Sequence, residues 1–218
     1  MVELFRSVAA TAVEVSAPRP GDHLVSPADV VMDRAFSLPA PPDVVWPWLV
    51  QLGKGRAGWY LTGRVERSVP PARRAARVID PRWQHLAVGD VIPDYGGRDE
   101  TFEVAEIAPP SHLVYTSRRR STDLSWTLQL SPTAGGSRLH LRLRLGPVKH
   151  RRVAESVGGA FDALTIAGLA AGLRERLEGS AARPGQPGTG PCRPDRLPRA
   201  IARDATRAPP APRSAARR

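Results

Sequence analysis

The clearest pattern in the chain is a strict alternation of apolar and polar residues over positions 138–145. Four leucines lie on one side of this predicted strand and four basic residues on the other, as in a half-buried strand. Four further strands are predicted between turns rich in Gly and Pro, at 88–95, 101–107, 112–117 and 124–130. Successive strands joined by short loops predict an antiparallel sheet with one apolar and one polar face. The polar face, including His140, is expected to be exposed to water.

A nearly uncharged segment follows the strands, from about Arg151 to Glu178. Between Gly158 and Leu173 its single charged residue is Asp162. We predict a helix that covers the apolar face of the sheet. A transmembrane helix is not expected, because the apolar stretch is shorter than the roughly 20 residues that cross a bilayer.

The segment before these strands predicts one more strand and two short helices. A strand over 34–38 ends at three prolines and leads into an apolar helix over 44–52. A second short helix is expected after Tyr60. Three tryptophans and this tyrosine fall within fifteen positions, in a chain that is otherwise poor in aromatic residues.

The two ends of the chain differ in character from its middle. Residues 1–19 read as a partly ordered N-terminal segment lying over the domain, and residues 20–178 as the domain itself. Residues 179–218 contain nine arginines and two aspartates, so they supply +7 of the net charge of +11. This tail has almost no large apolar residues and is predicted to be disordered. It lacks the interleaved aromatics of a nucleic-acid stacking surface, so a nucleic-acid function is not expected.

Several motifs in this order resemble one known superfamily. They are A-P-P at 40–42, V-W-P-W-L-V-Q-L-G-K-G-R-A-G-W-Y at 45–60, P-R-W-Q-H-L-A-V-G-D-V-I-P at 81–93 and T-F-E-V-A-E-I at 101–107. The chain is similar here to a bacterial branch of the SRPBCC superfamily, which includes START-like and polyketide cyclase-like proteins. The resemblance implies an α+β helix-grip fold. In that fold a curved antiparallel sheet wraps around a long C-terminal helix, two short helices follow the first strand, and an apolar cavity lies between sheet and helix.

The function expected from this reading is the binding or carriage of a small, largely apolar molecule in that cavity. Members of the superfamily bind, carry or transform different ligands, so the resemblance implies no single activity. The candidate polar contacts are Arg34, Tyr60, Tyr115 and Asp162. The candidate apolar lining is Trp48, Trp59, Trp126, Leu128, Leu141, Phe161 and Leu164. Trp46 is expected to pack in the core, whereas core and cavity mouth both stay open for Trp59 and Tyr60.

Arg34 and Asp162 each allow two interpretations. Arg34 shares the inward side of its strand with Phe36, so it could bind an acidic group of a ligand. The expected alternative is an ion pair with Asp33, Asp43 or Glu155. Asp162 is expected to be exposed, because an isolated carboxylate on an apolar helix is costly unless it is paired or hydrated.

Two other function classes remain open. A cyclase or aromatase-type enzyme could use the same cavity, with a buried Tyr, Arg or Asp moving protons. A ligand-free interaction module would have its cavity filled by side chains. No catalytic constellation can be identified, the five histidines lack metal-ligand spacing, and no cofactor motif occurs, so neither a metal nor a cofactor is expected. A single cysteine and an N-terminus unlike a signal peptide indicate a cytoplasmic protein.

Overall fold

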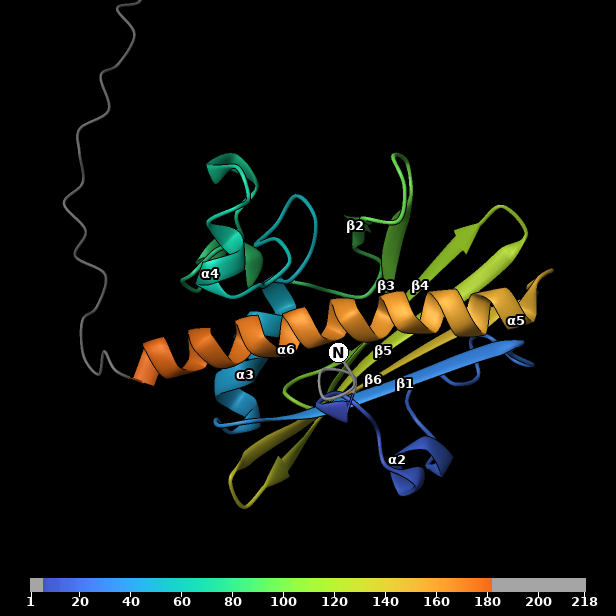
Figure 1. Ribbon diagram of the computed structural model, residues 1–218, viewed down its shortest axis with the longest axis horizontal. Coiled ribbons are helices and arrows are strands. Elements are labelled where there is room, and N and C mark those ends of the chain that lie inside the picture. Colours follow the sequence, from blue (N-terminus) through green and yellow to red (C-terminus); the bar gives the residue numbers. More distant parts are fainter. Residues whose placement is uncertain (1–5, 182–218) are drawn as a thin grey trace, which may run out of the picture. The chain divides into compact units, whose positions relative to one another are not determined.

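The computed structural model describes residues 6–181 (Figure 1). The predicted disordered tail lies outside the described residues from position 182 onward, and the division at residues 19 and 178 stays a prediction. The elements are α2 (Ala12–Ser16), β1 (Val30–Leu38), α3 (Pro42–Gln51), α4 (Gly63–Glu66), η1 (Pro71–Arg73), η2 (Pro81–Trp83), β2 (Val91–Pro93), β3 (Thr101–Ala108), β4 (His112–Arg119), β5 (Thr122–Thr133), β6 (Gly136–Gly146), α5 (Arg151–Val153), η3 (Ala154–Gly158) and α6 (Gly159–Ala181).

The strands form one six-stranded antiparallel sheet in the order β1-β6-β5-β4-β3-β2. Its register places the apolar side chains in rows across one face, because directly paired residues point to the same side. One such row is Phe36, Leu139 and Leu130, and all three are buried. The alternation in the sequence therefore predicted the inner face correctly.

The final helix crosses this inner face, as Figure 1 shows for α6 over β5 and β6. Ile166, Leu169 and Leu173 lie three to four residues apart and are almost fully buried, as expected for one face of a helix with 3.6 residues per turn. Helices α3 and α4 follow β1 and complete the predicted set. The helix-grip α+β fold is confirmed.

The outer face of the sheet differs from the prediction. His140 and Arg142 are only 3% and 4% exposed, although their side of the strand was expected to face water. Asp33 of β1 lies 3.1 Å from His140 Nε2 and 2.8 Å from Arg142 Nε. Arg142 also donates to the carbonyls of Val15 and Ala17 in the N-terminal segment. That segment covers the outer face, because its carbonyls accept the hydrogen bonds that water would otherwise accept.

Glu14 holds this segment to the sheet. Thr11 and Glu14 form a capping box at the start of α2, and the Glu14 carboxylate accepts from Arg138 Nε at 2.7 Å. The hydrogen bond from Arg138 lowers the pKa of Glu14 from 4.5 to about 2. Because the folded pKa lies below the unfolded one, this stabilisation is complete above about pH 4.5 and is lost as the pH falls toward 2.

We therefore expect acid to release the N-terminal segment before the sheet unfolds. The amide of Ala35 donates to the carbonyl of Val8 and reports on this attachment. Its protection against hydrogen exchange, corrected for the intrinsic rate, should fall between pH 4.5 and 2. In Glu14→Gln this pH-dependent fall should largely disappear. An equal fall in both proteins would show that another carboxylate holds the segment.

Candidate functional site

The space between sheet and helix is filled at one end. Trp48, Tyr60, Leu128 and Leu141 are all at most 2% exposed and belong to the central hydrophobic cluster. The Tyr60 hydroxyl donates to the carbonyl of Trp48 at 2.9 Å, and burial raises the pKa of Tyr60. The structure thus places these four candidates in the packed hydrophobic core.

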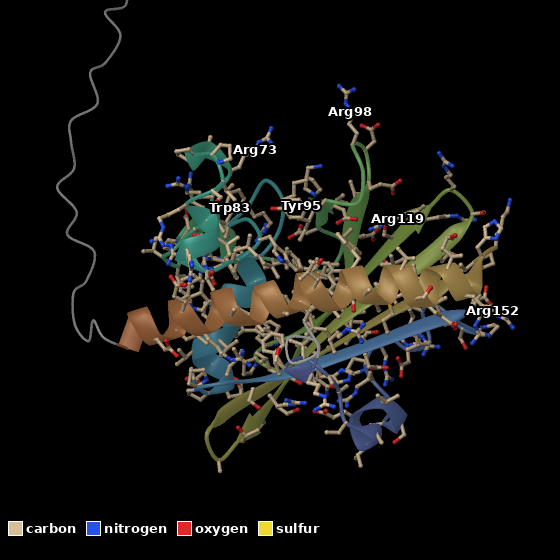
Figure 2. All side chains as sticks on the ribbon, viewed as in Figure 1. Arg73, Trp83, Tyr95, Arg98, Arg119 and Arg152 are labelled. Atoms are coloured by element: carbon tan, nitrogen blue, oxygen red, sulfur yellow. The ribbon has the colours of Figure 1, made fainter. Side chains whose placement is uncertain are left out.

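A cluster of aromatic rings lies beside this core. Trp126 stacks on Trp59 and on Tyr115, with ring centroids 6.1 and 5.9 Å apart. Phe102 and Tyr95 complete the cluster and were missed in the sequence, although Phe102 occupies an inward position of β3. Figure 2 shows Tyr95 beside the turn that links β2 and β3. The sequence candidates Trp59, Tyr115 and Trp126 are therefore brought together.

Two polar atoms near this cluster have no hydrogen-bond partner within residues 6–181. They are the indole Nε1 of Trp59 and the hydroxyl of Ser117, and both are buried. Ser117 lies two residues after Tyr115 on β4, so it points to the same side of the sheet. A buried donor without a partner is costly, and a bound molecule with an acceptor would satisfy it.

The inner wall becomes accessible toward one end of the sheet. On β6, Leu139 and Leu141 are buried, whereas Leu143 and Leu145 are only half-buried. Leu143 pairs with Trp126 on β5 and with Met32 on β1. The apolar surface of the sheet is thus packed under the second half of the helix and more open under the first half.

Arg34 and Asp162 meet where the helix crosses β1. Arg34 Nε lies 3.0 Å from Asp162 Oδ2, and Arg34 Nη2 donates to the carbonyl of Gly159 at 2.8 Å. Both side chains are about four-fifths buried. Burial raises the pKa of Asp162 even though Arg34 lowers it. The prediction that Asp162 is exposed is wrong, because Asp162 forms a buried ion pair with Arg34. The ion-pair partner of Arg34 is therefore Asp162 and not Asp33, Asp43 or Glu155.

A π-helical turn precedes this pair. Helix α5, the turn η3 and helix α6 run as one continuous helix from Arg151 to Ala181. By length and composition this helix could cross a membrane, so the argument from a short apolar stretch does not hold. The core packing of its second half instead gives its apolar residues a role within the domain. π-Turns are frequent at functional sites.

Phe161 and Leu164 do not line the inner space. Both are more than half exposed, and they point away from Ile166 and Leu169, which face the sheet. A helix turns by about 100° per residue, so positions 161 and 164 cannot share the face of 166 and 169. Their assignment to the cavity lining is corrected by this placement.

Two hollows lie at the surface of the described part of the chain. One, of about 390 Å³, lies between the N-terminal segment, β1 and the start of the long helix; Arg34, Met32 and Glu155 are among its lining residues. The other, of about 270 Å³, lies where Leu24 and Val25 meet β2 to β5, and Ser117 and Asp123 are among its lining residues. Neither of the two lies beneath the second half of α6. The first reaches Arg34 and so adjoins the Arg34–Asp162 pair.

A comparison of the sequence with models of known protein families found one match. Residues 29–183 match the family described as polyketide cyclase / dehydrase and lipid transport. A search of the curated proteins found no match.

Solved structures with a similar fold come from several bacteria. A Mesorhizobium loti protein is 19% identical, with a TM-score of 0.43 over 72% of this chain and 100% of that one. CalU16 from Micromonospora echinospora is 19% identical, with a TM-score of 0.41 over 70% and 86%. A Staphylococcus aureus protein is 11% identical, with a TM-score of 0.46 over 71% and 96%. With its family model matched over most of the domain, the chain belongs to the polyketide cyclase/dehydrase and lipid-transport family of the SRPBCC superfamily.

Proposed function

We propose that the protein binds a small, largely apolar molecule on the inner side of the sheet, beneath the first half of the long helix. The observation that carries this proposal is the half-buried wall formed by Leu143, Leu145 and Trp126, next to buried core leucines on the same strands. Small-molecule sites are mostly apolar, with a few polar groups that orient the ligand. The family description, polyketide cyclase / dehydrase and lipid transport, supports an apolar ligand.

Polar groups are available at both sides of this wall. The unpartnered Trp59 Nε1 can donate to a ligand oxygen, and the Ser117 hydroxyl can donate or accept. On the other side, the Arg34–Asp162 pair lies against the first turn of α6. A ligand with one or two oxygen substituents on an apolar ring or chain fits this arrangement.

The proposal is tested with 2-naphthol, a flat apolar molecule with one hydroxyl. Isothermal titration calorimetry should detect binding with a negative heat-capacity change, because apolar surface is buried. Leu143→Gln places an amide in the apolar wall, and leaving such a group without water costs about 1–3 kcal/mol. We expect its affinity for 2-naphthol to fall by roughly tenfold.

The matched control is Leu61→Gln. Leu61 is also half-buried, but it packs against Gly168 on the side of the long helix that faces away from the sheet. Its substitution should change the affinity by less than about twofold. Absence of binding to the native chain, or an equal loss in both variants, would argue against the proposed site.

One observation favours a second candidate function. Burial raises the pKa of Asp162, and a buried carboxyl group with a raised pKa can act as a proton donor or acceptor. An enzyme of cyclase or aromatase type could use it in the same site. Turnover that is lost in Asp162→Asn, while 2-naphthol still binds, would favour this candidate. A cytoplasmic location is part of both proposals, and the single cysteine is compatible with a reducing compartment.

A further inference from the structure

A row of exposed apolar side chains lies on the first half of the long helix. Val153, Val157, Phe161 and Leu164 are each between 54% and 71% exposed. Their spacing of four, four and three residues places them on one face. We call these four residues the apolar stripe. It extends over about 17 Å of helix, at 1.5 Å per residue.

The stripe faces away from the sheet. The side of the helix that carries Asp162, Ile166 and Leu169 contacts β1 and the core, and the stripe lies on the opposite side. On the second half of the helix, Tyr60 and Leu61 pack against Gly172 and Gly168. On the first half no such cover occurs among the described residues, as the exposure of the stripe demonstrates. Contiguous exposed apolar surface of this kind marks an interaction site.

Basic side chains surround the start of the stripe. Lys149, Arg151 and Arg152 are exposed and immediately precede it, and Figure 2 shows Arg152 at that end of the molecule. The β4–β5 hairpin, with Arg120, lies at the same end, because Thr122 Oγ1 donates to the carbonyl of Pro147. Lys149, Arg120 and Arg152 make no ion pair within residues 6–181, whereas Arg151 pairs with Glu155.

We propose that the apolar stripe and its basic end dock on a membrane surface that contains anionic lipids. A helix with a row of Val, Leu and Phe beside Lys and Arg binds in the interfacial plane, with its apolar face in the boundary of the acyl chains. The negative surface potential of anionic lipids attracts the basic side chains. An anionic membrane surface thus complements both the apolar side chains and the basic side chains of this part of the helix.

Two other occupants fit less well. The arginine-rich tail after Gly179 offers only Leu197 and Ile201 as large aliphatic side chains, and its charge of +7 has the same sign as the end of the stripe. A second copy of the chain would bring the same basic end to the contact. The exposed carboxylate within the stripe segment, Glu155, is already paired with Arg151. The tail has a net positive charge and a second copy brings the same basic residues, so neither complements Lys149 and Arg152 as anionic lipids do.

Docking by the stripe leaves the proposed ligand site on the other side of the helix. The two proposals are therefore independent and can fail separately. Phe161→Ser/Leu164→Ser should bind 2-naphthol with unchanged affinity, and Leu143→Gln should bind vesicles as the native chain does.

The test is sedimentation of the full chain with vesicles, either of phosphatidylcholine alone or of phosphatidylcholine mixed with phosphatidylglycerol. We expect the native chain to bind the mixed vesicles more tightly than the neutral ones. Phe161→Ser/Leu164→Ser should weaken binding to mixed vesicles at least roughly tenfold, since two exposed apolar anchors are removed. Lys149→Ser/Arg152→Ser should reduce the preference for phosphatidylglycerol.

The control is Val78→Ser/Val88→Ser, which removes two equally exposed apolar side chains from loops elsewhere. It should bind within about twofold of the native chain. All substituted residues are exposed, so the variants should keep the melting temperature of the native chain. Equal binding by the stripe variant and the native chain would assign any binding to the basic tail and overturn the proposal. It would also be overturned by no binding, or by a dimer that buries the stripe and persists on vesicles.

Discussion

Replacing Glu66 with alanine is expected to lower the free energy of unfolding by about 3–5 kcal/mol. Glu66 Oε1 accepts from Arg176 Nη2 at 2.6 Å, and Oε2 accepts from Arg77 Nη2 at 2.9 Å. Arg176 lies on the helix α6 and is buried. Without Glu66, the buried guanidinium of Arg176 would still donate to backbone carbonyls. It would lose the Glu66 carboxylate, whose negative charge compensates its positive charge in the protein interior. Chemical denaturation measures the difference.

The matched control for this prediction is Glu155→Ala. Glu155 also forms an ion pair with an arginine, Arg151, at 2.8 Å, but both side chains are largely exposed. Exposed pairs four residues apart on a helix contribute only about 0.3–0.5 kcal/mol. Similar losses for the two variants would show that burial does not determine the effect.

The second large effect is expected for Gly172→Ala. A Cβ at Gly172 would lie 2.6 Å from the carbonyl carbon and oxygen of Tyr60. These are backbone atoms of Tyr60, whose side chain is fully buried. They cannot move away by a side-chain rotation, so the helix would have to shift. Overpacking of this kind typically costs about 1–3 kcal/mol, and we expect about 3 kcal/mol because the added Cβ meets backbone atoms. Thermal or chemical unfolding measures the loss.

Gly179→Ala serves as the control on the same helix. No atom lies within 4 Å of a Cβ at Gly179. Alanine is the better helix former, so this variant should be neutral or more stable by up to about 1 kcal/mol. A neutral Gly172→Ala would mean that the loop after Trp59 yields easily, and that the close contact is not needed.

The fold was predictable because its main signals are local. The alternating leucines of 139–145 and the nearly uncharged helix after Gly158 each indicate an apolar surface, and these two surfaces pack together. The motifs at 45–60 and 81–93 supplied the family. What the pattern could not supply was the outer cover of the sheet. Period-two alternation shows that Arg142 points away from the core, but it does not show whether water or another segment lies there.

The site was predictable only in part. Trp59, Tyr115 and Trp126, each named as a cavity candidate, lie close together, and register explains the contact of Tyr115 with Trp126. That they line a ligand site stays a prediction. The Arg34–Asp162 pair joins residues 128 positions apart, which no local pattern could reveal. Phe161 and Leu164 were misplaced because the helix is apolar on nearly all sides. In such a helix composition does not indicate which side contacts the sheet.

The graded burial of the long helix has a consequence for how a guest molecule could reach the interior. Resistance to local opening follows the number of interior contacts, so the turns around Leu169 and Leu173 open only with the whole domain. The turns from Arg151 to Leu164 carry fewer such contacts, chiefly Ala163 and the bonds from Arg34 of β1 to Asp162 and Gly159, and are expected to separate from β1 at a lower free energy. If the protein binds a ligand as proposed, its entry would require the Arg34–Asp162 pair to break and the first half of the helix to separate from β1, while the second half stays packed.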